Sequence, residues 1–157
     1  MIKVDYFTGP QIITEFAGED LWRLKNDVRV KVFTNEGTLV YTMLPGFLTN
    51  MRSGSHLIDS IIPKFTKNND YNLALLCHDF AYTKLRSGFN PITRELADEL
   101  LRQMCILSGE LGTVRAWIMH KALRVGGGSA YNGENTGVYA GMEEYMGFEW
   151  FINLRLK

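Results

Sequence analysis

The spacing of the apolar residues changes along the chain, and this change restricts the fold more than any other sequence feature. In WRLKNDVRVKVF, Val28, Val30 and Val32 alternate with charged residues, a period of two that is typical of a half-buried strand. Over residues 71–125 the apolar positions instead follow the spacing of helices. A β-rich first part followed by a helical part predicts an α+β fold.

Residues 1–50 are expected to form an antiparallel β region. TNEGTL is a turn signal between the strand that contains Val28 and the following apolar stretch, TLVYTML. Pro45 and Gly46 are expected to end that second strand. Residues 51–70 are polar and loop-like, and KNND stands directly before the first expected helix.

Three helices are expected in the helical part. The first covers about 71–86 and is broken by RSGFNP, because glycine and an Asn-Pro pair interrupt a helix. Thr93 is expected to cap the second, RELADELLRQMCILS, which ends near Gly109. Thr113 is expected to cap the third, VRAWIMHKALRV, which stops at the glycines 126–128. These glycines follow a helix rather than precede one, so they do not favour a phosphate-binding loop.

Residues 129–157 are rich in glycine and aromatic residues and show no helical period. They close with FEWFINLRLK, which is expected to return to the sheet as a strand or to dock on a partner. We expect this tail to be irregular and to pack on another chain or on a distant part of the domain. A single domain is expected over residues 1–157. The aromatic residues that suit an interface are Tyr131, Tyr139, Tyr145, Phe148, Trp150 and Phe151.

Charge and composition exclude several classes of protein. Lysine plus arginine and aspartate plus glutamate are equal at 17 each, so no basic excess points to nucleic acid or to an anionic membrane. No apolar run approaches the roughly 20 residues of a spanning helix, and MIKVDYFTGPQ has no signal-peptide core. The cysteines, Cys77 and Cys105, make neither a disulfide framework nor a zinc site, and we expect free thiols in a reducing compartment.

The first expected helix carries two ionisable residues inside an apolar run, LLCHDFAYTK. At about 100° per residue, His78 and Tyr82 share one helical face, and Asp79 lies at the border of that face. Asp98 falls at the edge of the apolar stripe of the second helix. If the two helices pack antiparallel across their short connection, Asp98 comes near His78. Cys77 points away from this face, so a Cys-His nucleophile pair is not expected.

This proximity has chemical consequences. A half-buried carboxylate is costly unless it is paired or hydrogen-bonded. An imidazole whose other ring nitrogen donates to a carboxylate is held in one tautomer and becomes a better base. An adjacent aspartate that faces the cleft can hold a hard cation such as calcium. Base, orienting group and metal ligand together suit attack of water on an ester whose carbonyl the cation polarises.

The stretch HDFAYTKLRSGFNPITRELADELL, residues 78–101, resembles the active-site helices of phospholipases A₂, most closely those of parvovirus capsid proteins. That version has His-Asp-x-x-Tyr, a Gly-Asn-Pro-type loop and then Ala-Asp. The resemblance implies that His78 is the base, that Tyr82 and Asp98 orient it, and that Asp79 binds calcium. Phospholipases A₂ take most calcium ligands from a Gly-rich loop, whose nearest counterpart here, PGFLTNMRSGS, has a different pattern.

A second resemblance covers roughly residues 20–131. The order WRLKNDVRV, PGFLTN, CHDFAY, ELADELLRQM and AWIMHKALRVGGGSAYN is similar to an uncharacterised family of phage and prophage proteins. Its members read Gly-Phe-x-Thr-Asp, Ser-x-Pro, His-Asp-x-x-Tyr and Ala-Asp. This chain has Asn50 at that first aspartate, where an amide oxygen can still coordinate a cation, and it lacks Ser-x-Pro at the usual spacing.

Two functions follow from these resemblances. The first is a virion-associated phage protein, a head or tail component, made in the host cytoplasm and carrying a phospholipase-like site. Its expected partners are other virion proteins, or a second copy bound through the tail, and lipid. The alternative is a calcium-dependent hydrolase that acts on lipid or on another ester or amide in the host envelope.

Structural interpretations of the same residues stay open. His78 can be a hydrogen-bonded core residue, with Asp79 bound to Arg86 on the helix surface, and an isolated Asp98 is most often a solvated helix residue. His120 lies among apolar residues and is expected to be a satisfied core histidine rather than a ligand. His56, in a polar loop, is expected to be exposed.

Overall fold

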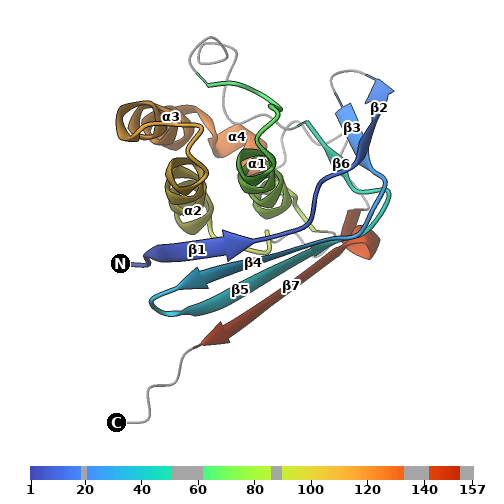
Figure 1. Cartoon of the computed structure of the whole chain (residues 1–157), viewed down its shortest axis with the longest axis horizontal. Helices are drawn as coiled ribbons and strands as arrows, with labels where there is room; N and C mark the ends of the chain where they lie inside the picture. Colours follow the sequence, from blue (N-terminus) through green and yellow to red (C-terminus); the bar gives the residue numbers. More distant parts are fainter. Residues whose placement is uncertain (19–20, 51–61, 86–89, 133–141, 153–157) are drawn as a thin grey trace.

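A four-stranded antiparallel sheet carries the helices on one face, and a smaller three-stranded sheet lies beside them (Figure 1). This computed structural model describes residues 1–18, 21–50, 62–85, 90–132 and 142–152. The strands are β1 (Val4–Thr8), β2 (Thr14–Gly18), β3 (Leu21–Leu24), β4 (Val28–Thr34), β5 (Gly37–Met43), β6 (Leu48–Thr49) and β7 (Met146–Ile152). The helices are α1 (Asn69–Tyr82), α2 (Arg94–Leu107), α3 (Thr113–Gly126) and α4 (Gly128–Tyr131), with a 3₁₀ turn, η2 (Met142–Tyr145). The α+β prediction is confirmed.

The main sheet has the order β1-β4-β5-β7, and its inner face packs on the helices. Val28, Val30 and Val32 of β4 are fully buried, as their alternation predicted. The expected turn joins β4 to β5 through a tight hairpin in which Thr34 pairs with Gly37. Gly37 is needed there because a Cβ would lie 2.2 Å from the backbone oxygen of Phe151 in β7.

The stretch WRLKNDVRVKVF forms two strands in different sheets and not one strand. β3 pairs with β2 and β6 in the small sheet, whereas β4 pairs with β1 and β5. The break occurs at Asn26, whose side chain accepts from the backbone N–H of Ile13 and donates to the carbonyls of Gln11 and Asp27. Such local bonds to the backbone compete with a continuous ladder.

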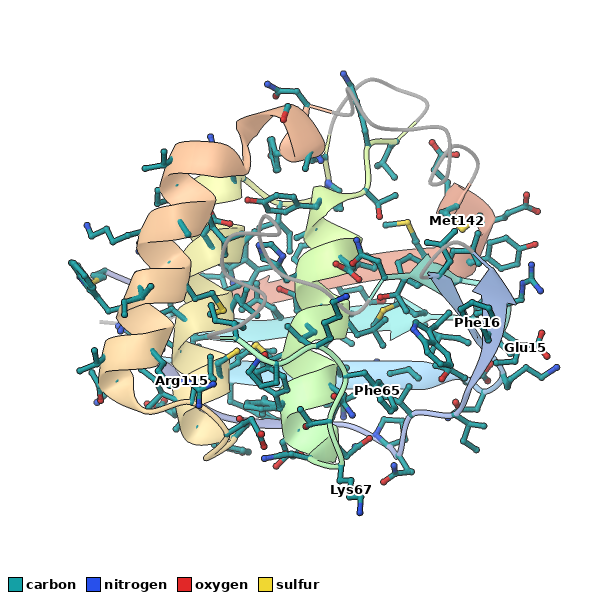
Figure 2. The ribbon with its side chains drawn as sticks, turned by 90° about the horizontal axis from the view of Figure 1, so that it is seen from above. Glu15, Phe16, Phe65, Lys67, Arg115 and Met142 are labelled. Carbon is teal, nitrogen blue, oxygen red and sulfur yellow. The ribbon has the colours of Figure 1, made fainter. Side chains whose placement is uncertain are left out.

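The small sheet is joined to the helical layer by aromatic contacts. Trp22 of β3 meets Phe16 of β2 edge to face, with 5.4 Å between ring centroids. Trp22 also stacks on Phe65, with 6.1 Å between ring centroids. Phe65 belongs to the segment that leads into α1 (Figure 2). β6 pairs antiparallel with β3, with Thr49 opposite Trp22, and reaches the site described below.

Helix caps explain where α1 to α3 begin and end. Asn68 caps α1, and Thr93 caps α2 as predicted, each accepting from a backbone N–H of the first turn. α1 ends at Tyr82, earlier than expected, because Thr83 adopts an extended backbone. The prediction that Thr113 caps α3 is wrong: Thr113 is the first helical residue, and Gly112 occupies the cap position without a side-chain bond.

The three main helices run antiparallel to their sequence neighbours. The side chain of Asn68, at the start of α1, donates to the carbonyl of Ser108 at the end of α2. Arg94, at the start of α2, donates to the carbonyl of Leu123 near the end of α3. α1 lies between α2 and the small sheet (Figure 1), and every residue over 71–81 is buried. A helix enclosed in this way tolerates ionisable side chains only where they have partners.

The C-terminal tail packs on a distant part of the same domain, as one alternative predicted. β7 pairs antiparallel with β5 along its whole length, so this part of the tail is regular and not irregular. Two short helical turns, α4 and η2, also lie in the tail, which was expected to be irregular. Tyr139 lies outside the described residues. Among the residues that the structure describes, no helix is long and apolar enough to cross a membrane.

Candidate functional site

Packing of α1 against α2 brings His78 and Asp98 together in the core. His78 Nε2 lies 3.0 Å from Asp98 Oδ1, and the two side chains are 3% and 0% exposed. The predicted proximity is therefore confirmed, and the interpretation of Asp98 as a solvated helix residue is wrong. The catalytic roles assigned to the two residues stay a prediction.

Tyr82 completes the contacts on the same carboxylate oxygen. Its hydroxyl donates to Asp98 Oδ1 at 2.6 Å, and its ring packs on the imidazole of His78 with 4.1 Å between centroids. Burial and the nearby Asp98 carboxylate raise the pKa of Tyr82, so its hydroxyl keeps its hydrogen at neutral pH. The helix stop after α3 permits this position, because a Cβ at Gly127 would lie 2.8 Å from the Tyr82 oxygen.

Two arginines lie on the other side of Asp98, and neither was among the residues predicted for the site. Arg124 Nη1, from the last turn of α3, donates to Asp98 Oδ2 at 3.0 Å, while its Nη2 bonds to Glu95. Arg94 Nε lies 3.9 Å from the same oxygen. Arg94 stands four residues before Asp98 on α2, so helical spacing was a usable signal. Arg124 is 26 positions away, and only the docking of α3 brings it close.

The hydrogen bonds of the cluster determine the charge of Asp98 and, through it, the tautomer of His78. Burial alone would raise the pKa of Asp98, but the hydrogen bonds from His78, Tyr82 and Arg124 outweigh it, so the pKa is lowered. Asp98 is therefore an ionised carboxylate at neutral pH, and such a group only accepts hydrogen bonds. The hydrogen shared with His78 must then lie on Nε2, which leaves the lone pair of a neutral imidazole on Nδ1.

Asp79, the next residue on α1, faces the small sheet instead of α2. The hydroxyl of Thr49 in β6 donates to Asp79 Oδ2, and both residues are buried. The structural alternative required Asp79 to lie on the helix surface, and this is wrong because Asp79 is buried. Its expected partner, Arg86, lies outside the described residues. Because Asn50 directly follows Thr49, the fold brings Asp79 to the segment that was expected to share a cation with it.

The described residues contain no group of three or more histidine, cysteine, aspartate or glutamate side chains that could hold a metal ion. Calcium sites use six to eight oxygen ligands. Asp79 and Asn50 would supply one carboxylate and one amide oxygen. Calcium binding by these two residues stays a prediction.

Residues 22–123 match the family described as protein of unknown function, DUF1353. The match covers more than half of the 157 residues. The chain belongs to the DUF1353 family. No curated protein and no solved structure matches it.

The DUF1353 match contains the whole predicted site and stops one residue before Arg124. His78, Asp79, Tyr82 and Asp98 lie inside it, as does Thr49, which the sequence analysis also missed. Thr49 and Asp79 are 30 positions apart, and no local pattern linked them.

The other described candidate residues of this DUF1353 chain make no hydrogen bond to the cluster. His120 is half-buried and not in the core; its Nε2 is 3.6 Å from Glu99 Oε2. Cys77 and Cys105 are buried free thiols, and burial raises the pKa of both, which disfavours a thiolate nucleophile. His56 lies outside the described residues.

Proposed function

We propose that this DUF1353 chain is a virion-associated phage protein, a head or tail component, whose His78–Asp98 pair hydrolyses an ester or amide of the host envelope. The observation that carries the hydrolytic part is the 3.0 Å contact between His78 Nε2 and a carboxylate that also accepts from Tyr82. These are the residues to which the phospholipase A₂ resemblance assigns base and orienting roles. The virion setting rests on the resemblance to phage and prophage proteins.

In the proposed reaction His78 is the general base. Its Nδ1 removes a proton from water while the water oxygen attacks the carbonyl carbon of the ester. The imidazolium that forms is stabilised by the Asp98 carboxylate at Nε2. The proton then passes from Nδ1 to the leaving alkoxide as the bond between carbonyl carbon and leaving oxygen breaks. His78 ends the cycle neutral, and the products are a carboxylic acid and an alcohol.

Asp98 needs a fixed position and a permanent charge for this role. Tyr82 fixes Oδ1, Arg124 fixes Oδ2, and together they keep the pKa of the carboxyl low. An orienting group held from two other helices is preorganised before substrate arrives, which reduces the reorganisation required in the reaction.

Calcium belongs to this proposal as an expectation from the resemblance, with Asp79 and Asn50 as its ligands. Bound there, it would supply polarisation of the substrate carbonyl. The proton transfers described above use His78 and Asp98 alone, so they do not depend on the cation. An assay can therefore test the role of His78 as a base separately from the role of calcium.

The test is hydrolysis of phospholipid vesicles and of soluble esters, each with calcium and with a chelator. His78→Gln is expected to lower the rate by about 10²–10⁴-fold, the usual contribution of a general base. His120→Gln is the matched control, because that imidazole pairs with Glu99 and makes no hydrogen bond to Asp98, and its rate should equal that of the wild type. Asp79→Asn should weaken any stimulation by calcium and leave the rate in chelator unchanged.

A folded wild-type protein that is inert on every lipid and ester class contradicts the hydrolytic proposal. Circular dichroism and thermal unfolding of each variant distinguish a lost base from a lost fold. Equal loss of rate in His78→Gln and His120→Gln would show a structural effect of histidine replacement rather than loss of a base.

The second candidate is a structural virion component with an inert site, and the full burial of Asp98 favours it. Asp98 joins side chains of α1 and α3 to α2, so the cluster has a folding role that needs no reaction. Mass spectrometry of purified particles tests the virion role. Particles that contain His78→Gln protein in normal amount and remain infectious would support the structural candidate over the hydrolytic one.

A further inference from the structure

The four-stranded sheet has two edges, β1 and β7, and the β1 edge is covered. The backbone N–H of Val4 donates to Gln103 Oε1 of α2 at 2.6 Å, and Gln103 Nε2 donates to the carbonyl of Ile2 at 3.1 Å. The register of β1 is also interrupted between Val4 and Tyr6. Bulges and covering side chains are devices that stop an edge strand from pairing with another chain.

The β7 edge has no such cover among the described residues. The backbone N–H of Leu44 donates to the carbonyl of Tyr145 at 2.9 Å. This bond shows which residues of β7 direct their backbone groups toward β5. Because bonded pairs alternate in an antiparallel ladder, Gly147, Glu149 and Phe151 bond to β5. The remaining residues direct their N–H and C=O groups to the outer edge, where no described group bonds to them: Met146, Phe148, Trp150 and Ile152.

The side chains of β7 do not protect this edge either. The sequence MGFEWFI contains no proline or lysine, and its one charge, Glu149, lies 3.8 Å from Arg29 of β4. Trp150, Phe151 and Ile152 are 42%, 56% and 67% exposed. In Figure 1, β7 is the edge of the sheet away from the helices, whereas β1 lies beside α2. A seven-residue, mostly apolar open edge is a template for another strand.

We propose that the end of β7, residues 150–152, pairs antiparallel with the same residues of a second copy of this chain, which joins the four-stranded sheets of the two copies across a two-fold axis at Phe151. In that register Trp150 lies opposite Ile152 of the second copy, so the exposed apolar residues cover one another. The backbone groups also suit this register: the N–H and C=O of Trp150 and of Ile152 all point to the outer edge, so they can bond to those of the second copy.

Charge selects a second copy in antiparallel orientation. Glu144 precedes β7, and the sequence after it carries Arg155 and Lys157. Antiparallel pairing directs the acidic start of one copy toward the basic end of the other, and a parallel pair would set like charges together. This inference does not depend on the His78 site.

The test is sedimentation velocity of the full chain over a range of concentrations. The wild type should form a concentration-dependent dimer. Trp150→Pro should be monomeric while keeping its fold, because the Trp150 N–H makes no bond to β5 and proline removes an edge donor. Ile152→Lys, which leaves the backbone unchanged, should also lose the dimer. Tyr6→Lys is the matched control at the β1 edge, where the side chain is 53% exposed, and it should dimerise normally.

A disulfide trap tests the register. Phe151→Cys should give a covalent dimer under mild oxidation, because a non-hydrogen-bonded antiparallel pair brings the two side chains close enough to bridge. The natural cysteines, Cys77 and Cys105, are buried, so the background should be low. A wild type that stays monomeric, a dimer that survives in both β7 variants, or equal cross-linking in Tyr6→Cys would each overturn the proposal.

Discussion

Two aspartates buried in the core, Asp79 and Asp98, have different environments. Asp98 is held by charged groups and hydrogen bonds from three helices, with Arg124 at 3.0 Å and His78 at 3.0 Å. Asp79 meets the neutral hydroxyl of Thr49 and joins α1 to the small sheet. Burial of a carboxylate is costly, and the groups that offset this cost at Asp98 include the cationic side chain of Arg124.

The two buried aspartates therefore differ in which elements they join. The Asp98 cluster is closed by its own partners and can orient His78 without a further group. Asp79 lies at the junction of α1 with β6, where Thr49 contacts it and Asn50 follows in the sequence. The predictions that follow test this comparison by removing each aspartate or its partner.

The largest effect is expected from Asp98→Ala. It leaves Arg124, His78 and Tyr82 without their common acceptor, and loss of one partner of a buried ionic group costs about 3–5 kcal/mol of unfolding free energy. Glu95→Ala is the matched control on the same helix, because Glu95 bonds to the same arginine but has a side chain 73% exposed. Its cost should stay below about 1 kcal/mol. Urea unfolding of both variants checks the prediction, and equal costs would refute the special position of Asp98.

Thr49→Val should have a smaller effect. It removes the hydroxyl that donates to Asp79 and keeps the side-chain volume, so the expected cost is that of a hydrogen bond to a charged group, about 1.5–3 kcal/mol. Thr49→Ser keeps the donor and serves as the control. If chemical denaturation finds valine and serine equally stable, the hydroxyl contributes nothing, and Asp79 is held by other contacts.

The smallest effect is a change in the acid dependence of stability. Because the pKa of Asp98 is lowered in the folded protein, the unfolded chain binds more protons, and stability falls as the pH falls. The Asp98 contribution is present above the unfolded pKa of about 3.9 and is lost as the pH drops through the folded value. One proton changes the unfolding free energy by at most about 1.4 kcal/mol per pH unit.

Asp98→Asn should therefore flatten the curve below about pH 4, measured by denaturation at a series of pH values. The pH dependence of the unfolding free energy of Asp79→Asn, the other buried aspartate, is measured for comparison. A curve for Asp98→Asn that parallels the wild type would mean that Asp98 does not carry the acid dependence; the other carboxyls with lowered pKa values, such as Glu99, would then account for it.

The sequence predicted the parts of this structure that depend on local pattern. Alternation placed the buried valines of β4, turn residues placed the β4–β5 hairpin, and hydroxyl capping placed Thr93 at the start of α2. The meeting of His78 with Asp98 was predictable as well, because both lie at defined angles on helices joined by a short connection.

The sequence did not predict the parts that depend on where distant elements dock. Arg124 reaches Asp98 only because α3 packs antiparallel to α2, and Thr49 reaches Asp79 only because Trp22 and its neighbours position β6. The break at Asn26 depends on its hydrogen-bond partner, Ile13, which stands directly before β2, 13 residues away in the sequence. Pattern fixes which face of an element is apolar, and it does not fix which element covers that face.

The pairing of β5 with β7 has a consequence for how the chain is made. Gly37 and Ile152 are register partners although their numbers differ by 115. The ribosome therefore releases β5 long before its second neighbour exists, and until then a strand that will be central has one open side. The tight β4–β5 hairpin can form early, but the sheet is completed only by a late, long-range closure, which is slow. During that interval the nascent chain is exposed to aggregation, so its yield should depend on temperature and on chaperones more than the stability of the finished fold would indicate.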